Sequence, residues 1–360
     1  MNVVRRMYRG ETTFDFVAIS KKTLIVSAAL VAGSILLMVV KPFNLSIDFT
    51  GGVIITVENQ ADATVESVRA DLRDIGYSDV RVQITGDGFL QIQTETLEAG
   101  EQDLLAQTVA ATAGATVNDL NISAVGPTFG AEVTRKAIEA LVVFIIVVAL
   151  FITWRFEWKM AMSALAALFH DLMIAGGIYA LIGFVVTPST IIAVLTILGY
   201  SLYDTVVVFD KVKENIVEED TRTTYRSIVN HSMNQVLMRS INTSLTSLLP
   251  VGVLLFVGFL ALGAETLKEF ALALFIGIAV GTYSSIFVAA PILSRWKSRE
   301  PEWDRREKRA EKRAAGKYVA DDDSDPHEGD AKPKKAPVSL EASGGQTVVA
   351  KPPKQRRKRR

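Results

Sequence analysis

The chain has 360 residues, no cysteine and a formal net charge of zero, because 39 basic residues balance 39 acidic ones. Apolar residues make up 49% and charged residues 22%, but the charges avoid several apolar runs of about 20 residues, the length of a membrane-spanning helix. This segregation excludes a soluble globular protein, and the absence of cysteine from the sequence excludes disulfides, thiolate catalysis and Cys-ligated metals.

Six apolar runs predict a polytopic α-helical membrane protein with six transmembrane helices. The runs lie near residues 23–40, 136–154, 160–183, 189–210, 241–262 and 270–293. No small-residue cleavage site precedes Lys41 and Pro42. We therefore expect the first run to be an uncleaved membrane helix and not a signal peptide.

Lys and Arg are concentrated in alternate connections, which predicts that both termini are cytoplasmic. They gather at the start of the chain, between the second and third runs, between the fourth and fifth, and after the sixth. The predicted divisions are a cytoplasmic N-terminus at 1–22, a first transmembrane helix at 23–42, an extracytoplasmic domain at 43–133, transmembrane helices two to six at 134–294 and a basic tail at 295–360.

The extracytoplasmic segment predicts a small α+β domain. Strand-like stretches cover 53–58, 79–84, 89–93 and 117–125, and helical stretches cover 65–75 and 101–113. A turn is expected at 86–88 between the second and third strands. The order βαββαβ is that of a split βαβ, ferredoxin-like unit. Such a fold hosts many functions, so it does not by itself indicate one.

The last 66 residues, 295–360, lose all apolar periodicity and carry about half of the Lys and Arg of the chain. A charged helix is expected up to about Lys317, and disorder beyond it. The main expected role of this tail is to fix the topology and keep the chain soluble. It is also a candidate for contact with anionic lipid head groups or with ribosomal RNA.

Asp204 lies inside the apolar run 191–209 and is the foremost candidate functional residue. A charged carboxylate facing lipid is costly, so Asp204 should face protein or water, and a proton carrier is its simplest role. The alternative is a structural buried carboxylate, or one that just reaches the cytoplasmic interface. Arg239 is the expected partner, on a helix face that also carries Asn242, Thr243 and Thr246. Protonation of Asp204 would remove its attraction for Arg239 and let the helices rearrange.

Two further features lie within the apolar runs. His170 and Asp171 form a polar pair in the middle of the third run, where they are either part of a proton path or an interhelical hydrogen bond. In the sixth run, small residues recur every four positions, which predicts close helix packing more than transport. They are Ala273, Gly277, Gly281, Ser285 and Ala289.

The motif Ser46-Ile-Asp-Phe-Thr-Gly-Gly52 follows the first run directly. Gly51 and Gly52 allow the backbone to turn tightly where the chain leaves the membrane, and Asp48 is expected to cap that turn. We assign these three residues a structural role. The segment from Val125 to Gly130 is the matching hinge before the second run.

Three separated motifs carry a resemblance to a known family. They are Ile47-Asp-Phe-Thr-Gly-Gly52, the stretch from Leu198 to Asn215 that holds Gly-Tyr-Ser-Leu-Tyr-Asp-Thr, and the stretch from Met233 to Ser247 that holds Arg-Ser-Ile-Asn-Thr-Ser. Over about 15–295 the chain resembles the SecF family of protein-export membrane proteins, within the SecD/SecF group of RND-type proton-driven transporters. The resemblance places Asp204 and Arg239 on the family's membrane Asp and Arg. Tyr203 departs from the pattern, which usually has Asn before that Asp.

The resemblance implies one half of an RND-type fold and no enzymatic activity. It implies work with SecD beside the SecYEG translocon, in which the proton motive force promotes late steps in the export of unfolded polypeptides across the bacterial cytoplasmic membrane. No P-loop, HExxH motif or nucleophile elbow occurs, and the three His do not cluster as ligands, so no cofactor is expected. Two alternatives remain: half of a proton-driven small-molecule or lipid exporter, and a membrane scaffold without ion flux.

Overall fold

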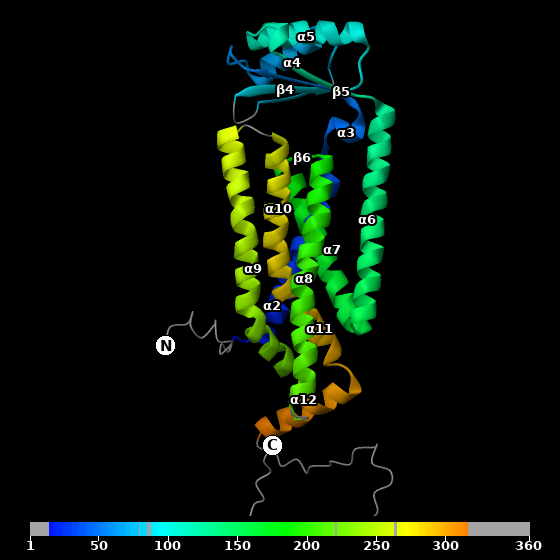
Figure 1. The fold of residues 1–360 in the computed structure, drawn as a ribbon, viewed down its shortest axis with the longest axis vertical. Coiled ribbons are helices and arrows are strands. Elements are labelled where there is room, and N and C mark those ends of the chain that lie inside the picture. Colours follow the sequence, from blue (N-terminus) through cyan, green and yellow to red (C-terminus); the bar gives the residue numbers. More distant parts are fainter. Residues whose placement is uncertain (1–13, 79, 85–87, 220–221, 263–264, 316–360) are drawn as a thin grey trace, which may run out of the picture. The chain divides into compact units, whose positions relative to one another are not determined.

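The computed structural model describes residues 14–78, 80–84, 88–219, 222–262 and 265–315. Within these residues, six helices are long and apolar enough to cross a membrane, as the sequence predicts. They are α2 (Phe16–Val40), α6 (Pro127–Arg155), α7 (Trp158–Ile182), α8 (Pro188–Glu218), α9 (Tyr225–Leu262) and α10 (Glu265–Ser284), the last continued by the π-helical segment η2 (Ser285–Ala289) and by α11 (Ala290–Lys297) (Figure 1).

Three of these helices, α2, α6 and α9, begin well before the apolar runs that predict them. Helix α2 begins at Phe16 because the side chain of Asp15 accepts a hydrogen bond from the backbone N–H of Ala18 at 2.9 Å and so caps the helix. Helix α9 begins at Tyr225 and has 38 residues, so it also contains the polar stretch that precedes the fifth run. Hydropathy marks the apolar part of a helix, whereas caps and tertiary contacts decide where the helix starts.

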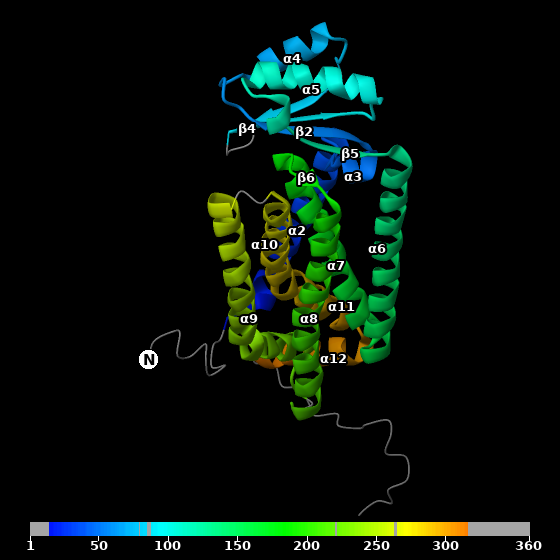
Figure 2. The same ribbon diagram turned by 45° about the horizontal axis from the view of Figure 1, so that its top comes forward.

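The first third of α9 bends at the end of the bundle away from the sheet (Figures 1 and 2). There it forms hydrogen bonds with the start of α2 and with α8. The side chain of Asn230 accepts a hydrogen bond from the backbone N–H of Phe16 at 2.8 Å. Asn234 bonds both the N–H and the carbonyl of Phe14, at 3.0 and 2.8 Å. Asn215 of α8 donates to the hydroxyl of Ser232 at 2.7 Å.

The charged helix expected up to about residue 317 is present as α12 (Pro301–Ala314). Trp303 is buried against the ring of Tyr225, with ring centroids 5.0 Å apart. Glu300 pairs with Lys159 at 2.9 Å, and Glu307 pairs with Arg226 at 3.2 Å. Helix α12 is therefore held against α7 and α9. The tail predicted to be disordered lies outside the described residues.

Small residues let α10 approach its neighbours closely, as the repeat in the sixth run predicts. A Cβ atom on Gly277 would overlap Ile197 of α8, and one on Gly281 would lie 2.8 Å from the Cβ of Ser201. On α7, a Cβ on Gly177 would overlap Ser34 of α2. Close approach is what allows short polar side chains of different helices to meet inside the bundle.

The sheet domain follows α2. Its strands are β2 (Gly52–Glu58), β3 (Arg81–Ile84), β4 (Phe89–Thr94) and β5 (Asn121–Val125), and its helices are α4 (Val65–Asp74) and α5 (Ala99–Ala113). The four strands pair antiparallel in the order β3-β4-β2-β5. Both helices cover the same face of the sheet, over a core that includes Val53, Ile55, Val57, Val68 and Leu105 (Figure 2). The turn expected at 86–88 lies mostly outside the described residues.

The last strand is shorter than predicted. Residues Val117–Asp119 form a 3-10 turn, and β5 starts only at Asn121. The carboxylate of Asp119 accepts hydrogen bonds from the hydroxyl of Thr116 at 2.7 Å and from its backbone N–H at 2.9 Å. These two bonds, the hydroxyl first, lower the pKa of Asp119. This local side-chain capping competes with strand pairing. Val117 therefore lies in the turn, although valine favours strands.

The close contact of α10 with α8 generates a stability prediction. Gly277→Ala adds a methyl group where Ile197 already lies, so we expect a loss of about 1–3 kcal/mol in the free energy of unfolding. The measurement is unfolding in mixed micelles by increasing SDS. Gly199→Ala on α8 is the matched control, because nothing lies within 4 Å of the Cβ it would gain. Equal effects of the two substitutions would contradict the packing described above.

Candidate functional site

Asp204 lies on the buried face of α8, one turn after Ser201 and next to Thr205. The residue is 6% exposed. Its Oδ1 accepts a hydrogen bond from the hydroxyl of Ser240 on α9 at 2.7 Å, and its Oδ2 has no hydrogen-bond partner among the described residues. A buried carboxylate with one oxygen hydrogen-bonded and the other without a partner among the described residues is a candidate for binding and releasing a proton.

Arg239, the expected partner, points elsewhere. Its Nη2 donates to the hydroxyl of Tyr203 at 2.9 Å, and both residues are exposed on the surface of the bundle. In the part of the chain that the structure describes, no ion pair within 4.0 Å joins Arg239 to Asp204. Successive residues of an α-helix are about 100° apart, so Ser240 faces the carboxylate and Arg239 does not.

The polar face predicted for α9 is thus displaced by one residue. Asn242 and Thr243 are half-buried, and the hydroxyl of Thr243 donates to the carbonyls of Arg239 and Ser240 in its own helix, at 3.0 Å each. The face directed into the bundle carries Ser240 and Ser244, both buried. The i, i+3, i+4 spacing correctly predicts a helix. Because α9 has polar residues on two faces, the spacing does not determine which of these faces points into the bundle.

Asp171 is a second buried carboxylate and has more partners than Asp204. It is 2% exposed, and its Oδ2 accepts hydrogen bonds from Ser201 of α8 at 2.5 Å and from Ser284 of α10 at 2.8 Å. Its Oδ1 lies 3.1 Å from Nδ1 of His170, whose ring stacks on Tyr283. The carboxylate thus makes the interhelical hydrogen bonds that were one of its two predicted roles, and these bonds do not exclude the other.

Helix α10 links the surroundings of the two carboxylates through adjacent hydroxyls. Ser284 reaches Asp171, and Ser285 lies 2.9 Å from the hydroxyl of Thr205, the neighbour of Asp204. The helix changes from α to π at this point, and single π turns inside α-helices are frequent at functional sites. The small-residue repeat predicts a packing role for Ser285, and it does not include Ser284. Two consecutive serines within an apolar run were the available signal.

The predicted glycine turn and the hinge after β5 are in contact. Ile47–Thr50 forms the short helix α3, in which Asp48 accepts a hydrogen bond from the hydroxyl of Ser46 at 3.0 Å. Gly51 and Gly52 have φ values of 74° and 125°, which other residues rarely adopt. A Cβ on Gly51 would lie 2.8 Å from Cα of Pro127, and one on Gly52 would overlap the carbonyl of Thr94. The backbone geometry therefore requires both glycines.

A small parallel sheet joins this region to the membrane helices. Strand β1 (Asn44–Leu45) pairs with β6 (Val185–Val186), which lies in the connection between α7 and α8. Arg81 of β3 contacts the side chain of Asn44. The sequence gives no signal for this pairing, because each strand has two residues and the two lie far apart along the chain.

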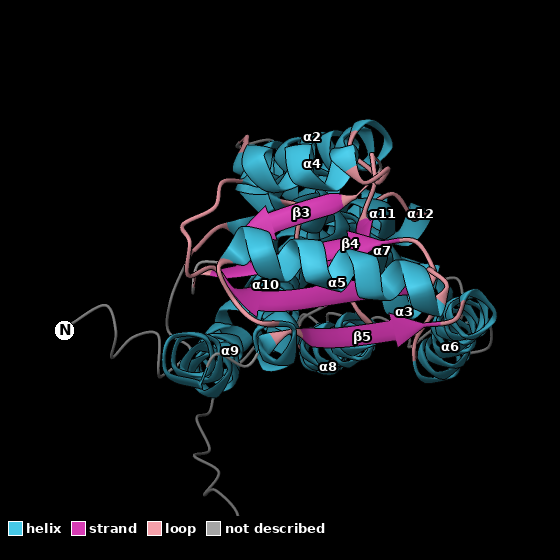
Figure 3. Cartoon of the chain, turned by 90° about the horizontal axis from the view of Figure 1, so that it is seen from above, coloured by secondary structure: helices cyan, strands magenta, loops and turns pink. Residues whose placement is uncertain are grey.

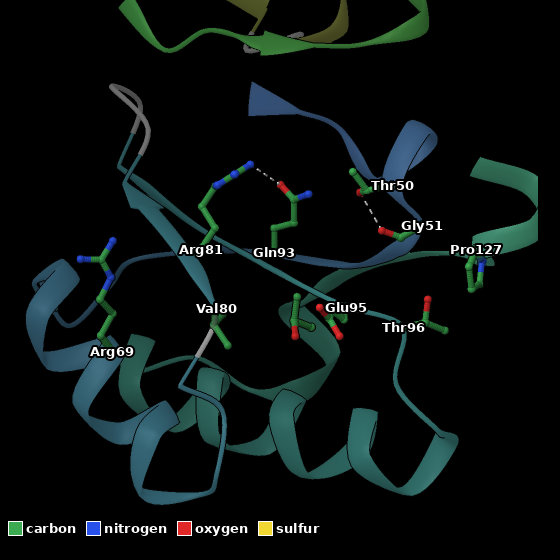
Figure 4. Close-up of a pocket in the computed structure, with 10 residues that line it drawn as sticks. Thr50, Gly51, Arg69, Val80, Arg81, Gln93, Glu95, Thr96 and Pro127 are labelled. Atoms are coloured by element: carbon green, nitrogen blue, oxygen red, sulfur yellow. Dashed lines mark hydrogen bonds between the residues drawn. The ribbon is translucent and has the colours of Figure 1, made fainter. Parts of the chain in front are cut away.

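A polar cleft of about 660 Å³ opens beside the glycine turn (Figure 4). Arg69, Arg81 and Glu95 supply its charges, and the guanidinium of Arg81 points toward the amide of Gln93, 3.5 Å away. Among the described residues, no group of three or more His, Cys, Asp or Glu side chains is placed to hold a metal ion.

The hydrogen bonds of Asp171 generate a second stability prediction. Ser201→Ala and Ser284→Ala each leave one donor on Oδ2, whereas the double variant leaves none. We expect each single change to cost about 1 kcal/mol, and the pair to cost at least about 0.5 kcal/mol more than their sum. The measurement is a double-mutant cycle of unfolding in micelles. Ser163→Ala is the control, because among the described residues that hydroxyl bonds the carbonyl of Lys159 in its own helix and no carboxylate. Strict additivity would show that the two serines do not share one acceptor.

Comparison with known proteins shows extensive similarity to protein-export components. Residues 105–299 match the family "Protein export membrane protein SecD/SecF, C-terminal", and residues 36–58 match the "SecD/SecF GG Motif". The protein translocase subunit SecF of Streptomyces coelicolor is 40% identical over 86% of this chain and 84% of its own length. SecF of Mycobacterium tuberculosis is 42% identical over 80% of this chain and 68% of its own length.

The fold is also that of a solved structure. The crystal structure of SecDF, a translocon-associated membrane protein from Thermus thermophilus, covers 82% of this chain with a TM-score of 0.73 and 34% sequence identity. The match takes up 42% of that SecDF chain, so this chain spans about two fifths of it.

Proposed function

Because the chain belongs to the SecF family and is a multi-pass membrane protein, we propose that it acts with SecD in the Sec protein-export machinery. It uses the proton motive force to promote late steps of polypeptide translocation across the bacterial cytoplasmic membrane. The observation that carries the proposal is the buried carboxylate of Asp204, held by Ser240 on the facing helix. In this role the chain is an accessory subunit of the translocase and has no enzymatic activity.

Relatives named SecDF, in which SecD and SecF form a single chain, support SecD as the partner. SecDF proteins of Thermus thermophilus and Bacillus subtilis are 37% and 33% identical to this chain, which covers 40% and 38% of their lengths. The exposed pair of Arg239 and Tyr203 adds a physical reason. A guanidinium in contact with lipid at the membrane centre costs about 2.5–3.5 kcal/mol or more, so the α8–α9 surface is the side on which the SecD half packs.

The proposed proton step uses the two oxygens of Asp204. Oδ2 has no hydrogen-bond partner in the described part of the chain and accepts the proton, while Ser240 stays on Oδ1. Loss of the negative charge weakens the hold of the carboxylate on the Ser240 hydroxyl and its attraction for the positive charge of Arg239. Helices α8 and α9 are then free to shift. Asp171, Asn242 and Thr243 are proposed to line the proton path.

One elementary charge crossing 100 mV is worth about 2.3 kcal/mol, which is enough to bias a two-state switch but not to pull a polypeptide far. Several protons are therefore expected for each exported chain. The route of coupling is the connection from α8 through β6 and β1 to α3 and the sheet domain. In this route Asp48, Gly51 and Gly52 keep the turn after α2 rigid. The sheet domain holds or releases the unfolded polypeptide.

The proposed topology has both termini in the cytoplasm and the segment 43–133 outside. The antiparallel order β3-β4-β2-β5 supports a ferredoxin-like domain there. The SecYEG translocon is the proposed neighbour in the membrane. Contact of the basic tail with anionic lipid or the ribosome stays a prediction.

Single cysteines test this topology in a chain that has none of its own. Asp103→Cys, on the exposed side of α5, should be labelled by a membrane-impermeant maleimide in intact cells. Lys213→Cys, exposed near the end of α8, should be labelled only after the membrane is opened. Equal labelling of both positions in intact cells would rule out the proposed orientation.

Asp204→Asn tests the proton step, because Asn has nearly the same shape but cannot ionise. Membrane vesicles with comparable amounts of assembled complex should lose the stimulation of export by an imposed proton gradient. Arg239→Ala should weaken that stimulation, and Arg239→Lys should retain part of it because the charge remains. Asp210→Asn is the matched control, since this carboxylate lies on the same helix and pairs with Arg155 at the surface. If Asp204→Asn vesicles respond to the gradient like wild type, Asp204 is a structural carboxylate.

A further inference from the structure

His170 is a buried imidazole in the middle of α7, and the proton step at Asp204 does not use it. The residue is 4% exposed. Its Nδ1 lies 3.1 Å from Oδ1 of Asp171, whereas its Nε2 is buried and has no hydrogen-bond partner among the described residues. A buried polar atom without a partner is unusual in a folded protein and requires an explanation.

The surroundings of Asp171 determine which nitrogen of a neutral His170 carries the hydrogen. The hydroxyls of Ser201 and Ser284 donate to Oδ2 at 2.5 and 2.8 Å, and short bonds of this kind are typical of an ionised carboxylate. An ionised carboxylate can only accept hydrogen bonds, so the hydrogen is assigned to Nδ1, which donates it to Oδ1. Nε2 then keeps a free lone pair. His170 is therefore a base whose open nitrogen lies inside the bundle.

A proton bound at Nε2 would cancel a buried negative charge. While His170 is neutral, its pair with Asp171 carries one negative charge in an apolar bundle, which is costly. The protonated pair is neutral as a whole, with the imidazolium next to its counter-charge. The ring of Tyr283 also stacks on that of His170, with ring centroids 6.0 Å apart, and an aromatic face attracts a cation. Asp171 is a poorer acceptor for this proton, because both of its oxygens already accept hydrogen bonds.

Four helices supply the groups around this pair (Figure 3). Helices α8 and α10 supply the two serine hydroxyls, and α10 also supplies Tyr283. Helix α2 supplies Ser27, which is buried and whose hydroxyl lies 3.0 Å from that of Tyr283. The titratable groups in contact with His170 are thus Asp171 and Tyr283.

Charged side chains elsewhere on the neighbouring helices have other surroundings. Lys21 and Lys22 of α2 are exposed, and Asp204 of α8 is bonded to Ser240 of α9. Others are engaged in pairs, namely Arg155 of α6 with Asp210 of α8, Arg295 of α11 with Ser20 of α2, and Lys297 of α11 with Glu157. Among the described contacts, Asp171 is therefore the counter-charge of His170.

We propose that His170 is a second proton-binding residue of the bundle, which takes a proton on Nε2 and holds it as an imidazolium paired with Asp171. This inference rests on the proposed use of the proton motive force. One proton site then faces α9 at Asp204, and the other faces α2 and α10 at His170. The hydroxyls of Ser284 and Ser285 on α10 lie between them, since Ser284 reaches Asp171 and Ser285 reaches the neighbour of Asp204. Each site changes from one negative charge to none when it binds its proton.

NMR of isotope-labelled histidine detects the proton on His170 directly. The full chain is labelled and studied in lipid bilayers with unlabelled SecD, and the signals that His170→Gln removes are assigned to this residue. We expect Nδ1 to stay protonated and Nε2 to gain a proton as the pH falls from about 8 to about 5. At the pH where half of the wild-type chain is protonated, Asp171→Asn should lower that fraction to below about one tenth, because the counter-charge is lost. An Nε2 that stays unprotonated over this whole range in the wild-type chain would overturn the proposal.

Export in membrane vesicles tests whether this proton is used. His170→Gln keeps a side chain that can donate to Asp171 but cannot ionise. We expect it to lose most of the stimulation by an imposed proton gradient, while export without the gradient stays at the wild-type level. His231→Gln is the matched control and should respond like wild type, because this imidazole is exposed on α9 and bonds to Gln235.

The two variants separate this inference from the proposed function. If His170→Gln keeps the full stimulation with the wild-type dependence on pH, while Asp204→Asn loses it, His170 has a structural role and the proposal fails. If both variants respond to the gradient like wild type, the proton-coupled function itself fails. Loss of stimulation in both, together with a proton on Nε2 in the NMR measurement, is the result that the proposal requires.

Discussion

The arrangement of the membrane helices depends on satisfying two carboxylates inside an apolar bundle. A carboxylate without partners is expensive in that environment, and water is excluded as a partner where helices pack closely. Asp171 obtains hydroxyls from α8 and α10, and Asp204 obtains one from α9. These hydroxyls belong to serine, whose side chain is short, so the helix axes must come close together.

Glycine makes that approach possible. Gly277 and Gly281 put the backbone of α10 directly against Ile197 and Ser201 of α8. This approach brings together the two helices that each donate a serine hydroxyl to Asp171, and it places the hydroxyl of Ser285 2.9 Å from that of Thr205. A residue larger than glycine at 277 or 281 would push α10 away from α8.

The sequence was sufficient to predict the features that depend on local pattern. Six apolar runs predicted the six helices, and the type and position of Asp204 predicted that its side chain faces protein, where it is buried. The strand and helix order of the sheet domain also followed from periodicity. What it could not predict was which face of α9 meets Asp204, because Arg239 and Ser240 are neighbours in a helix whose rotation is fixed only by packing.

Features that depend on contacts between distant residues were missed for a similar reason. The pairing of β1 with β6 joins residues on either side of two membrane helices, and each strand is too short to show alternation. In the sequence, Ser284 is one of several small residues in an apolar run. Its hydrogen bond to Asp171 depends on how α10 packs against α7. Local capping by Thr116 and Asp119 shortened the last strand, where propensity alone favoured a longer one.

Because α9 is long, a movement of this helix within the membrane would also reach the contacts made by its first third. At 1.5 Å per residue its 38 residues would extend about 57 Å, whereas the hydrocarbon core is about 30 Å thick. The bend in its first third lays much of the excess across the end of the bundle instead of projecting it into solvent (Figure 2). That part holds the start of α2 through Asn230 and the helix α12 through Tyr225 and Arg226. In the proposed proton step, a rotation of α9 at Ser240 would therefore also move this first third of the helix, together with its contacts to α2 and α12.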